Sequence, residues 1–367
     1  MTGHGGNIHK ASQLTGIRLN RIFDFSASIN PLGVPKSAAL AIKSGIGLLP
    51  HYPEPFADSL SSFIARHYSL QAGSVICGNG STELIYLPAR FLKPKKILIT
   101  APTFSEYEKA CNSSNGKLQV VSYNLQRENN FDIDPDSYIQ AMKGGLHSPL
   151  FTSHSSRPVD MAFLCNPNNP TGRLLERESV LKIAAAAKKA KCYLIVDEAF
   201  MDFCPDETVV KHVSRNPYLI VLRSLTKFYA LAGLRIGFGV FPQKIAAAIK
   251  KQKEPWTVNC LADTVAKTVL EDSAYSAKSL ETIRREKRFL ETGFERLGIK
   301  YIPSSANYYL VNMKNAQKVI RDLAGKGILV RDCSNFPGLG RTYIRLAVRT
   351  RRENEMLLKE LAGLCQA

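Results

Sequence analysis

The chain has 367 residues, 45% hydrophobic and 22% charged, which is enough to bury the cores of a large α/β domain and a smaller one. Its 49 lysines and arginines against 31 acidic residues give a formal charge of +18, but they are scattered in short groups without a recognised nucleic-acid module. No signal peptide and no apolar run long enough to cross a bilayer is visible. We therefore expect a cytoplasmic protein with neither nucleic acid nor membrane as a partner.

The eight cysteines show no C-x-x-C pair and no regular spacing, and several lie in apolar stretches. This pattern predicts free thiols in a reducing compartment rather than a disulfide framework. The seven histidines form no ligand cluster, so no metal site is expected.

In chain order, the first informative feature is a glycine turn that opens a helix. Residues 78–83, Gly-Asn-Gly-Ser-Thr-Glu, lie between a short predicted strand (74–77) and an apolar helical pattern (84–91). Exposed N–H groups at a helix start favour an anion, which makes a phosphate site of Gly80, Ser81 and Thr82. The alternative is that Ser81 is only an N-cap, with Glu83 in the first turn.

Three further predicted strands end in residues suited to ligand binding. The strand 97–100 precedes Phe104 and Tyr107, and the strand 161–165 precedes the turn Asn166-Pro167-Asn168-Asn169-Pro170-Thr171-Gly172. The strand 193–197 ends in Asp197. Strand ends are where an α/β sheet presents ligand groups.

A lysine lies between a hydroxyl and an arginine in the next segment. Ser224 is three residues before Lys227, and Arg235 is eight residues after it. A Schiff-base lysine needs an amine that can lose its proton, and nearby donors that hold a cofactor phosphate. Alone, the motif is better interpreted as ordinary surface charges, but the upstream turn and Asp197 reverse that judgement.

The alternation of strands and helices predicts an α/β fold with a mainly parallel sheet covered by helices on both faces. Strands are expected near 97–100, 161–165, 193–197, 219–223 and 235–240. A small C-terminal α/β domain follows, with strands near 308–311, 328–330 and 343–348. We expect an N-terminal segment (1–35), a large domain (36–279) and a small domain (280–367), with a loop or insertion of unknown purpose at 142–159.

In their order and spacing, N-P-x-N-P-T-G, D-E-A-F, S-L-T-K and G-L-R-I-G resemble the fold-type I pyridoxal-phosphate (PLP) enzymes of the aspartate aminotransferase superfamily. The resemblance implies a type I PLP-dependent transferase-like fold with PLP on Lys227. Asp197 would pair with the pyridine nitrogen, and Asn169 would donate to the phenolic oxygen. Phe104, or as second choice Tyr107, would stack on the ring, and the phosphate would be bound by Gly80, Ser81, Thr82, Ser224 and Arg235. Phe200 stands where relatives carry a tyrosine, so one hydrogen bond to the phenolic oxygen is missing.

Further segments make the whole chain similar to the threonine-phosphate decarboxylases of cobalamin biosynthesis, with histidinol-phosphate aminotransferases as near neighbours. They are Gly3-His4-Gly5-Gly6-Asn7, the stretch 25–33 and Arg331-Asp332-Cys333-Ser334-Asn335-Phe336. The implied substrate is a small phosphorylated amino acid, and the implied product is aminopropanol phosphate. His4 and Arg331 would hold the substrate phosphate, and Asn30 and Arg345 would orient the carboxylate.

Tyr52 matches a position from which relatives reach the partner subunit's cofactor phosphate, so the resemblance implies a homodimer with a shared active site.

Two other functions stay open. An aminotransferase would use Lys227, Asp197 and Asn169 in the same way. A non-catalytic regulator is disfavoured because the lysine is present and no residues are left for a DNA-binding domain.

Overall fold

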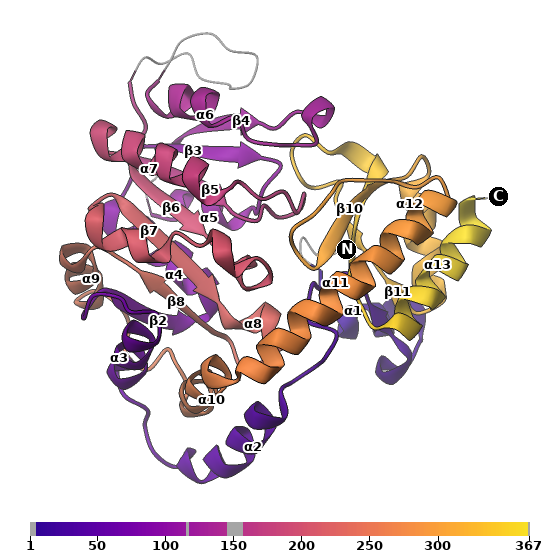
Figure 1. The fold of residues 1–367 in the computed structure, drawn as a ribbon, viewed down its shortest axis with the longest axis horizontal. Helices are drawn as coiled ribbons and strands as arrows, with labels where there is room; N and C mark the ends of the chain where they lie inside the picture. Colours follow the sequence, from indigo (N-terminus) through magenta and orange to yellow (C-terminus); the bar gives the residue numbers. More distant parts are fainter. Residues whose placement is uncertain (1–4, 115–116, 145–156, 366–367) are drawn as a thin grey trace.

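A seven-stranded sheet forms the larger part of the computed structural model, which describes residues 5–114, 117–144 and 157–365 (Figure 1). The strand order is β2-β8-β7-β6-β5-β3-β4. All neighbouring pairs are parallel except the two that involve β8. The strands are β2 (Val75–Asn79), β3 (Lys96–Ala101), β4 (Gln119–Asn124), β5 (Met161–Cys165), β6 (Tyr193–Asp197), β7 (Leu219–Ser224) and β8 (Ile236–Val240). The mainly parallel sheet predicted from the sequence is confirmed, and β4 is an addition to it.

Helices cover both faces of this sheet, which explains why its strands read as continuous apolar runs. Successive residues of β6 show the two faces, because Leu194 and Val196 belong to one buried cluster and Ile195 to the other. The first face is covered by α3 (Asp58–His67), α6 (Pro135–Met142), α7 (Arg177–Ala190) and α10 (Cys260–Glu271). The second is covered by α4 (Gly80–Leu92), α5 (Glu106–Asn112) and α9 (Gln243–Lys250).

A smaller four-stranded antiparallel sheet has the order β12-β13-β10-β9. Its strands are β9 (Lys300–Tyr301), β10 (Tyr308–Asn312), β12 (Arg331–Asp332) and β13 (Tyr343–Ala347). One core cluster packs this sheet against α11 (Ser273–Arg296), α12 (Ala316–Gly325) and α13 (Arg351–Cys365). The predicted strands at 308–311 and 343–348 are found here, and β11 (Ile328–Leu329) lies outside this sheet.

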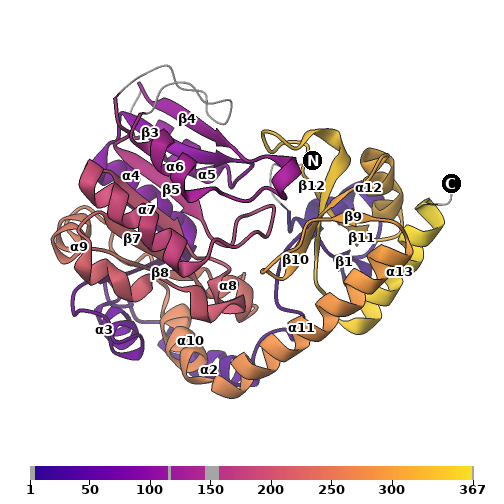
Figure 2. The same cartoon turned by 45° about the horizontal axis from the view of Figure 1, so that its top comes forward.

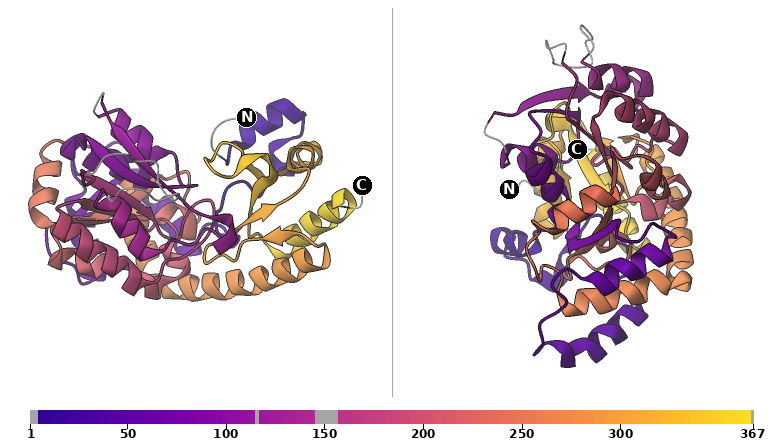
Figure 3. Two further views of the ribbon diagram at one scale, coloured as in Figure 1. Left: turned by 90° about the horizontal axis from the view of Figure 1, so that it is seen from above. Right: turned by 90° about the vertical axis from the view of Figure 1, so that its left-hand side faces the viewer.

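The N-terminal segment lies with this smaller part, because β1 (Phe23–Asp24) pairs in parallel with β11. Helix α1 (Ile8–Thr15) contacts α12, and α2 (Lys36–Gly45) packs against α10 below the large sheet (Figure 2). The long α11 runs from the large sheet's helices to the small sheet and bridges the two (Figure 3). The domain boundaries drawn from the sequence stay a prediction, and most of the expected 142–159 loop lies outside the described residues.

Within the described ranges, no helix combines the length and apolar character that crossing a membrane requires.

Candidate active site

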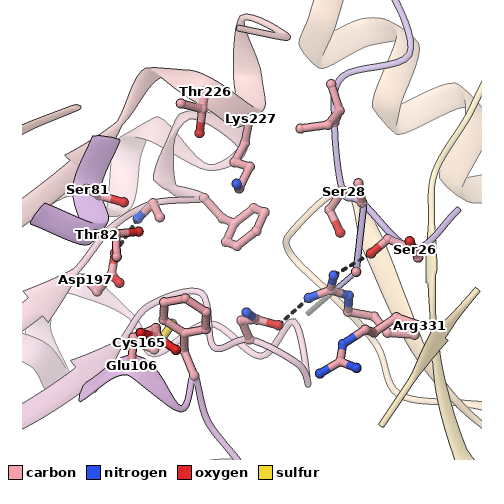
Figure 4. A pocket seen from close by; sticks show the side chains of 18 of the residues that line it. Ser26, Ser28, Ser81, Thr82, Glu106, Cys165, Asp197, Thr226, Lys227 and Arg331 are labelled. Atoms are coloured by element: carbon pink, nitrogen blue, oxygen red, sulfur yellow. Dashed lines mark hydrogen bonds between the residues drawn. The ribbon is translucent and has the colours of Figure 1, made fainter. Parts of the chain in front are cut away.

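A cavity of about 420 Å³ opens between the carboxyl ends of β5 and β6 and the smaller sheet (Figure 4). Segments from both parts of the molecule line it, so the fold assembles a site that no single stretch of sequence contains. Most of the predicted residues line the cavity, namely Ser81, Thr82, Phe104, Asn169, Asp197, Lys227, Arg235, Arg331 and Arg345.

Lys227 lies in the short helix α8 (Leu225–Phe228), which follows β7 directly, and its amine points into the cavity (Figure 4). The surroundings lower the pKa of this amine to about 8. Burial is the main cause, and the charges of Arg235 and Arg345 add to it because they disfavour a third cation. A larger share of the Lys227 amine is therefore unprotonated and nucleophilic near neutral pH than for an ordinary lysine.

Asp197 closes the cavity floor at the carboxyl end of β6 and is buried. Its Oδ2 accepts a hydrogen bond from the Tyr107 hydroxyl at 2.8 Å, and its Oδ1 accepts one from the backbone N–H of Ala199 at 3.0 Å. Burial raises the pKa of Asp197, whereas these donors and the charge of Lys227 act in the opposite direction. The carboxylate is thus fixed in orientation and suited to a cationic ring N–H.

The glycine turn forms a cradle at the N-terminus of α4. Gly80 is the first residue of this helix at φ +76°, and the N-cap residue Asn79 makes no side-chain cap bond. A Cβ built on Gly80 would clash with an Nη of Arg235, so the guanidinium lies directly against the turn. Helix N–H groups and an arginine together favour a phosphate. The N-cap of α4 is Asn79 and not Ser81. The Glu83 side chain accepts the Asn79 N–H at 2.6 Å.

Ser224 caps α8 and is buried. Its hydroxyl lies 2.7 Å from the Thr226 hydroxyl, and it is Thr226 that lines the cavity. The structure therefore adds Thr226 to the predicted cradle and places Ser224 behind it. The motif Ser-Leu-Thr-Lys already held this signal, since it offers two hydroxyls before the lysine.

Two arginines lie side by side on the small sheet, because Arg331 on β12 pairs in register with Arg345 on the neighbouring strand β13. Arg345 donates to the Asn169 side chain and, at 2.9 Å, to the backbone oxygen of Ser26. Arg331 donates to Asn335 at 2.8 Å and lies over the Phe336 ring at 5.1 Å. Two like charges on paired positions repel each other, so an anion in the cavity would stabilise this arrangement.

The structure gives Asn30 partners within the chain, and its role towards a substrate carboxylate stays a prediction. Its amide donates to the Phe228 backbone oxygen at 2.7 Å and to the Ser279 hydroxyl at 2.8 Å, and its Oδ1 accepts the Leu32 N–H. Asn30 is also absent from the cavity lining. These bonds engage its amide, and they tie the N-terminal segment to the helix of Lys227.

Ser28, two residues earlier, lines the cavity with a buried hydroxyl that has no hydrogen-bond partner among the described residues. The sequence gives no spacing signal that separates Ser28 from Asn30. Gly5 also lines the cavity, and the adjacent Gly6 N–H donates to the Ser26 hydroxyl at 2.8 Å. His4 lies outside the described residues.

The two candidate stacking aromatics differ in their surroundings. Tyr107 is buried, packs on Phe163 and is held by Asp197, whereas Phe104 is partly exposed at the cavity wall. Phe104 is therefore the better placed of the two, and its stacking role stays a prediction. Phe200 lines the cavity without a hydroxyl and packs edge-on against Tyr308.

Tyr52 does not reach the cavity of its own chain. Its side chain is 86% exposed and packs on Trp256 with ring centroids 5.4 Å apart. It could act in an active site only if that site belonged to a second copy of the chain.

The residues present fit pyridoxal phosphate. The start of α4 at Gly80, the Thr82 hydroxyl and the Arg235 guanidinium together suit a phosphate, Asp197 suits the ring nitrogen, and Lys227 suits the aldehyde carbon. The nucleophile, the ring anchor and the phosphate cradle line one cavity. This arrangement can hold a cofactor on one side and an anionic substrate beside the two arginines on the other.

Comparisons with known proteins agree with this geometry. The model of the family "Aminotransferase class I and II" matches residues 20–361. The chain is 36% identical to a threonine-phosphate decarboxylase of Salmonella typhimurium, covering 99% of this chain and 96% of that protein. The crystal structure of a histidinol-phosphate aminotransferase from Clostridium acetobutylicum matches with a TM-score of 0.83 and 31% identity, covering 93% and 98% of the two chains. That of an L-threonine-O-3-phosphate decarboxylase from Porphyromonas gingivalis matches with a TM-score of 0.81 and 26% identity, covering 94% and 99%.

Proposed function

Because the chain belongs to the class I and II aminotransferase family, we propose that it is a PLP-dependent threonine-phosphate decarboxylase. The reaction converts L-threonine O-3-phosphate to (R)-1-amino-2-propanol O-2-phosphate for the nucleotide-loop linker of cobalamin. The observation that carries this proposal is the 36% identity to a threonine-phosphate decarboxylase over almost the whole of both chains. The paired arginines of the cavity support it, since this substrate carries two anionic groups.

The reaction breaks the bond between Cα and the carboxylate, releases CO2 and places a proton on Cα. Bound pyridoxal phosphate supplies the sink for the electron pair left on Cα. Asp197 would keep the ring nitrogen of the bound cofactor protonated, since a fixed anion favours the adjacent cation. Lys227, with its pKa lowered to about 8, can hold a proton and return it within the working pH range.

The residues that bind the substrate carboxylate and phosphate set its orientation, and this orientation decides which bond to Cα breaks. We assign the carboxylate to Arg345 and the phosphate to Arg331, with Ser28 as an added donor in the role first expected of Asn30. Arg345 is held by Asn169 and Ser26 O, so its orientation is set before substrate arrives. Gly5 lines the cavity, and His4, which precedes it in the sequence, remains a candidate phosphate ligand.

A histidinol-phosphate aminotransferase is the second candidate, because a solved enzyme of that name shares the fold at 31% identity. Its substrate has a phosphate and an amine but no carboxylate. The keto acid that an aminotransferase also takes does carry a carboxylate. The pair Arg331 and Arg345 therefore fits both reactions, and a decarboxylase differs in engaging both arginines with one substrate.

We also infer a homodimer. Several large apolar side chains are exposed around α2 and the segment after it, which we call the α2 patch: Leu40, Ile46, Leu48, Leu49, Tyr52 and Trp256. Thr82 and Arg235 of the phosphate cradle also line an open hollow of about 530 Å³ with Thr257, one residue after Trp256. A second copy seated on the α2 patch would bring its Tyr52 towards the cradle.

We also infer a reducing, cytoplasmic location. The seven cysteines whose side chains the structure describes are all free thiols, which is consistent with it.

The deciding experiment incubates PLP-loaded protein with L-threonine O-phosphate in the absence of any keto acid. We expect continuing CO2 release over many turnovers with the PLP absorbance retained. The absence of CO2, together with conversion of the cofactor to its pyridoxamine form by histidinol phosphate, would assign the aminotransferase reaction instead. A Lys227→Ala variant, which should release no CO2, controls for spontaneous chemistry.

A further inference from the structure

A second cavity, of about 370 Å³, lies beside the middle of α11 and shares no lining residue with the active site. We call it the hinge cavity, because α11 is the helix that bridges the large and small sheets (Figures 1 and 3). Its walls come from α11, from the segment that follows β6 and from the loop before β10. No step of the proposed reaction uses any residue of these walls.

The wall from α11 is cationic. Arg284, Lys287 and Arg288 face one carboxylate, Glu291, whose Oε1 already accepts the Tyr309 hydroxyl at 2.5 Å. In the described part of the chain, neither Arg284 nor Arg288 has a carboxylate within 4.0 Å. The neighbouring Arg285 differs, because it pairs with the buried Glu286 at 3.0 Å. Like charges one helical turn apart destabilise a helix, so an anion between them would be favoured.

The opposite wall is polar and belongs to a different segment. Lys287 donates to the backbone oxygen of Ser304, and the Ser304 hydroxyl accepts the Ala306 N–H at 3.1 Å. Ser305 donates its N–H to the Gly172 oxygen at 2.8 Å. The cavity thus lies between α11 and a loop that contacts the turn of Asn169.

We propose that the hinge cavity binds a small phosphate-bearing anion between Arg284, Arg288 and the Ser304–Ser305 loop. Two guanidinium groups suit a phosphate dianion because each can donate two parallel hydrogen bonds. Leu280, Ile283 and Phe203 form an apolar side against which a short hydrocarbon chain fits. Free phosphate and a phosphate monoester share the recognised group, and the apolar side distinguishes them.

The anion is placed to affect the active site through contacts already present. Arg173, the residue after Gly172, donates to the Pro303 oxygen at 3.0 Å, and Gly172 accepts from Ser305. Asn169, in the same turn, accepts from Arg345. An occupant that ties α11 to the Ser304–Ser305 loop therefore acts on the turn that orients a substrate arginine.

The test is calorimetric titration of the PLP-loaded protein with inorganic phosphate and, separately, with isopropyl phosphate at low ionic strength. The variant is Arg284→Gln/Arg288→Gln, and the control is Lys278→Gln, an exposed cation of the same helix outside the cavity. We expect the double variant to lose one bound phosphate per chain, or to bind it at least tenfold more weakly, while the control matches the wild type. Tighter binding of isopropyl phosphate would identify a monoester as the ligand, and tighter binding of inorganic phosphate would identify the free ion.

Equal stoichiometry and affinity in the double variant and the control would overturn the proposal, with the remaining binding assigned to the active-site arginines. If the double variant does not fold, Arg284→Gln alone, at an exposed position, should still weaken binding several-fold. CO2 release from L-threonine O-phosphate should persist in both variants, because neither Arg284 nor Arg288 lines the active-site cavity. Failure of this proposal is therefore separate from failure of the proposed reaction.

Discussion

Lys227 is the residue whose titration most directly tests the electrostatics of the site. Its pKa of about 8 means that the fraction of unprotonated amine, the form that attacks an aldehyde, increases as the pH approaches 8 and saturates above it. We expect the rate of PLP uptake by cofactor-free protein to rise tenfold per pH unit below 8 and to level off above it. Absorbance stopped-flow across pH 6 to 10.5 measures this, and a rate still rising at pH 10 would contradict it.

Arg331 carries the second prediction at this scale. Replacing Arg331 by Gln removes a charge-assisted contact of about 1.5–3 kcal/mol, so KM for L-threonine O-phosphate should rise about 10- to 100-fold. The value of kcat should change less, because the phosphate lies away from the bond that breaks. Arg341→Gln, an exposed arginine near the same sheet, is the control and should leave KM unchanged. An unchanged KM in Arg331→Gln would remove this residue from the substrate site.

Residues in contiguous motifs were predictable from the sequence. Residues whose role depends on hydrogen-bond partners from distant segments were not. Lys227, Asp197 and Asn169 line one cavity because each lies at or shortly after the carboxyl end of a strand of the same sheet. The sequence could not show the partners of Asn30, since only the fold shows that Phe228 and Ser279 accept from its amide. Ser28 offers no pattern beyond an isolated hydroxyl, and its importance appears only through burial without a partner.

At the scale of elements, the start of α4 depends on a glycine for two separate reasons. Gly80 has φ +76°, and its missing Cβ leaves room for Arg235. Gly73 has φ +74° with nothing within 4 Å of a built Cβ, so it offers a matched control. Replacing either glycine by Ala should lower the free energy of unfolding of the protein by about 1–2 kcal/mol, because Ala is strained at a positive φ.

Only Gly80→Ala should also weaken PLP binding, by about tenfold or more, because Arg235 must move out of the cradle. Equilibrium dialysis of PLP against both variants, beside their thermal unfolding, measures the two effects independently. Equal PLP affinity in Gly80→Ala and Gly73→Ala would show that Arg235 does not need that space.

The elements themselves were largely predictable because apolar runs and their turn residues signal buried parallel strands. The helix expected at 84–91 extends back to Gly80, since its first turn is polar and carries the phosphate cradle instead of core contacts. Strand β4 was missed because only alternate residues, Val121 and Tyr123, are buried at this sheet edge. Pairing of β1 with β11 joins segments from opposite ends of the chain, and no local pattern could indicate it.

At the scale of the whole molecule, the α2 patch predicts a dimer. Leu40 is 68% exposed on α2, and Leu14 is equally exposed on α1, which lies beside the small sheet. Leu40→Glu places a charge in the expected interface and should shift the protein towards monomer, whereas Leu14→Glu should not. Sedimentation velocity of both variants at several concentrations measures the shift.

The same dimer should be needed for catalysis, because Tyr52 cannot reach the phosphate cradle of its own chain. Monomeric Leu40→Glu should therefore lose most of its CO2 release and bind PLP more weakly. Mixing a Tyr52→Ala protein with a Lys227→Ala protein provides a sharper readout. Each mixed dimer then has one site that contains both an intact lysine and the partner's intact tyrosine, so activity should recover on mixing. A monomer with full activity, or mixing without recovery, would show that each chain works alone.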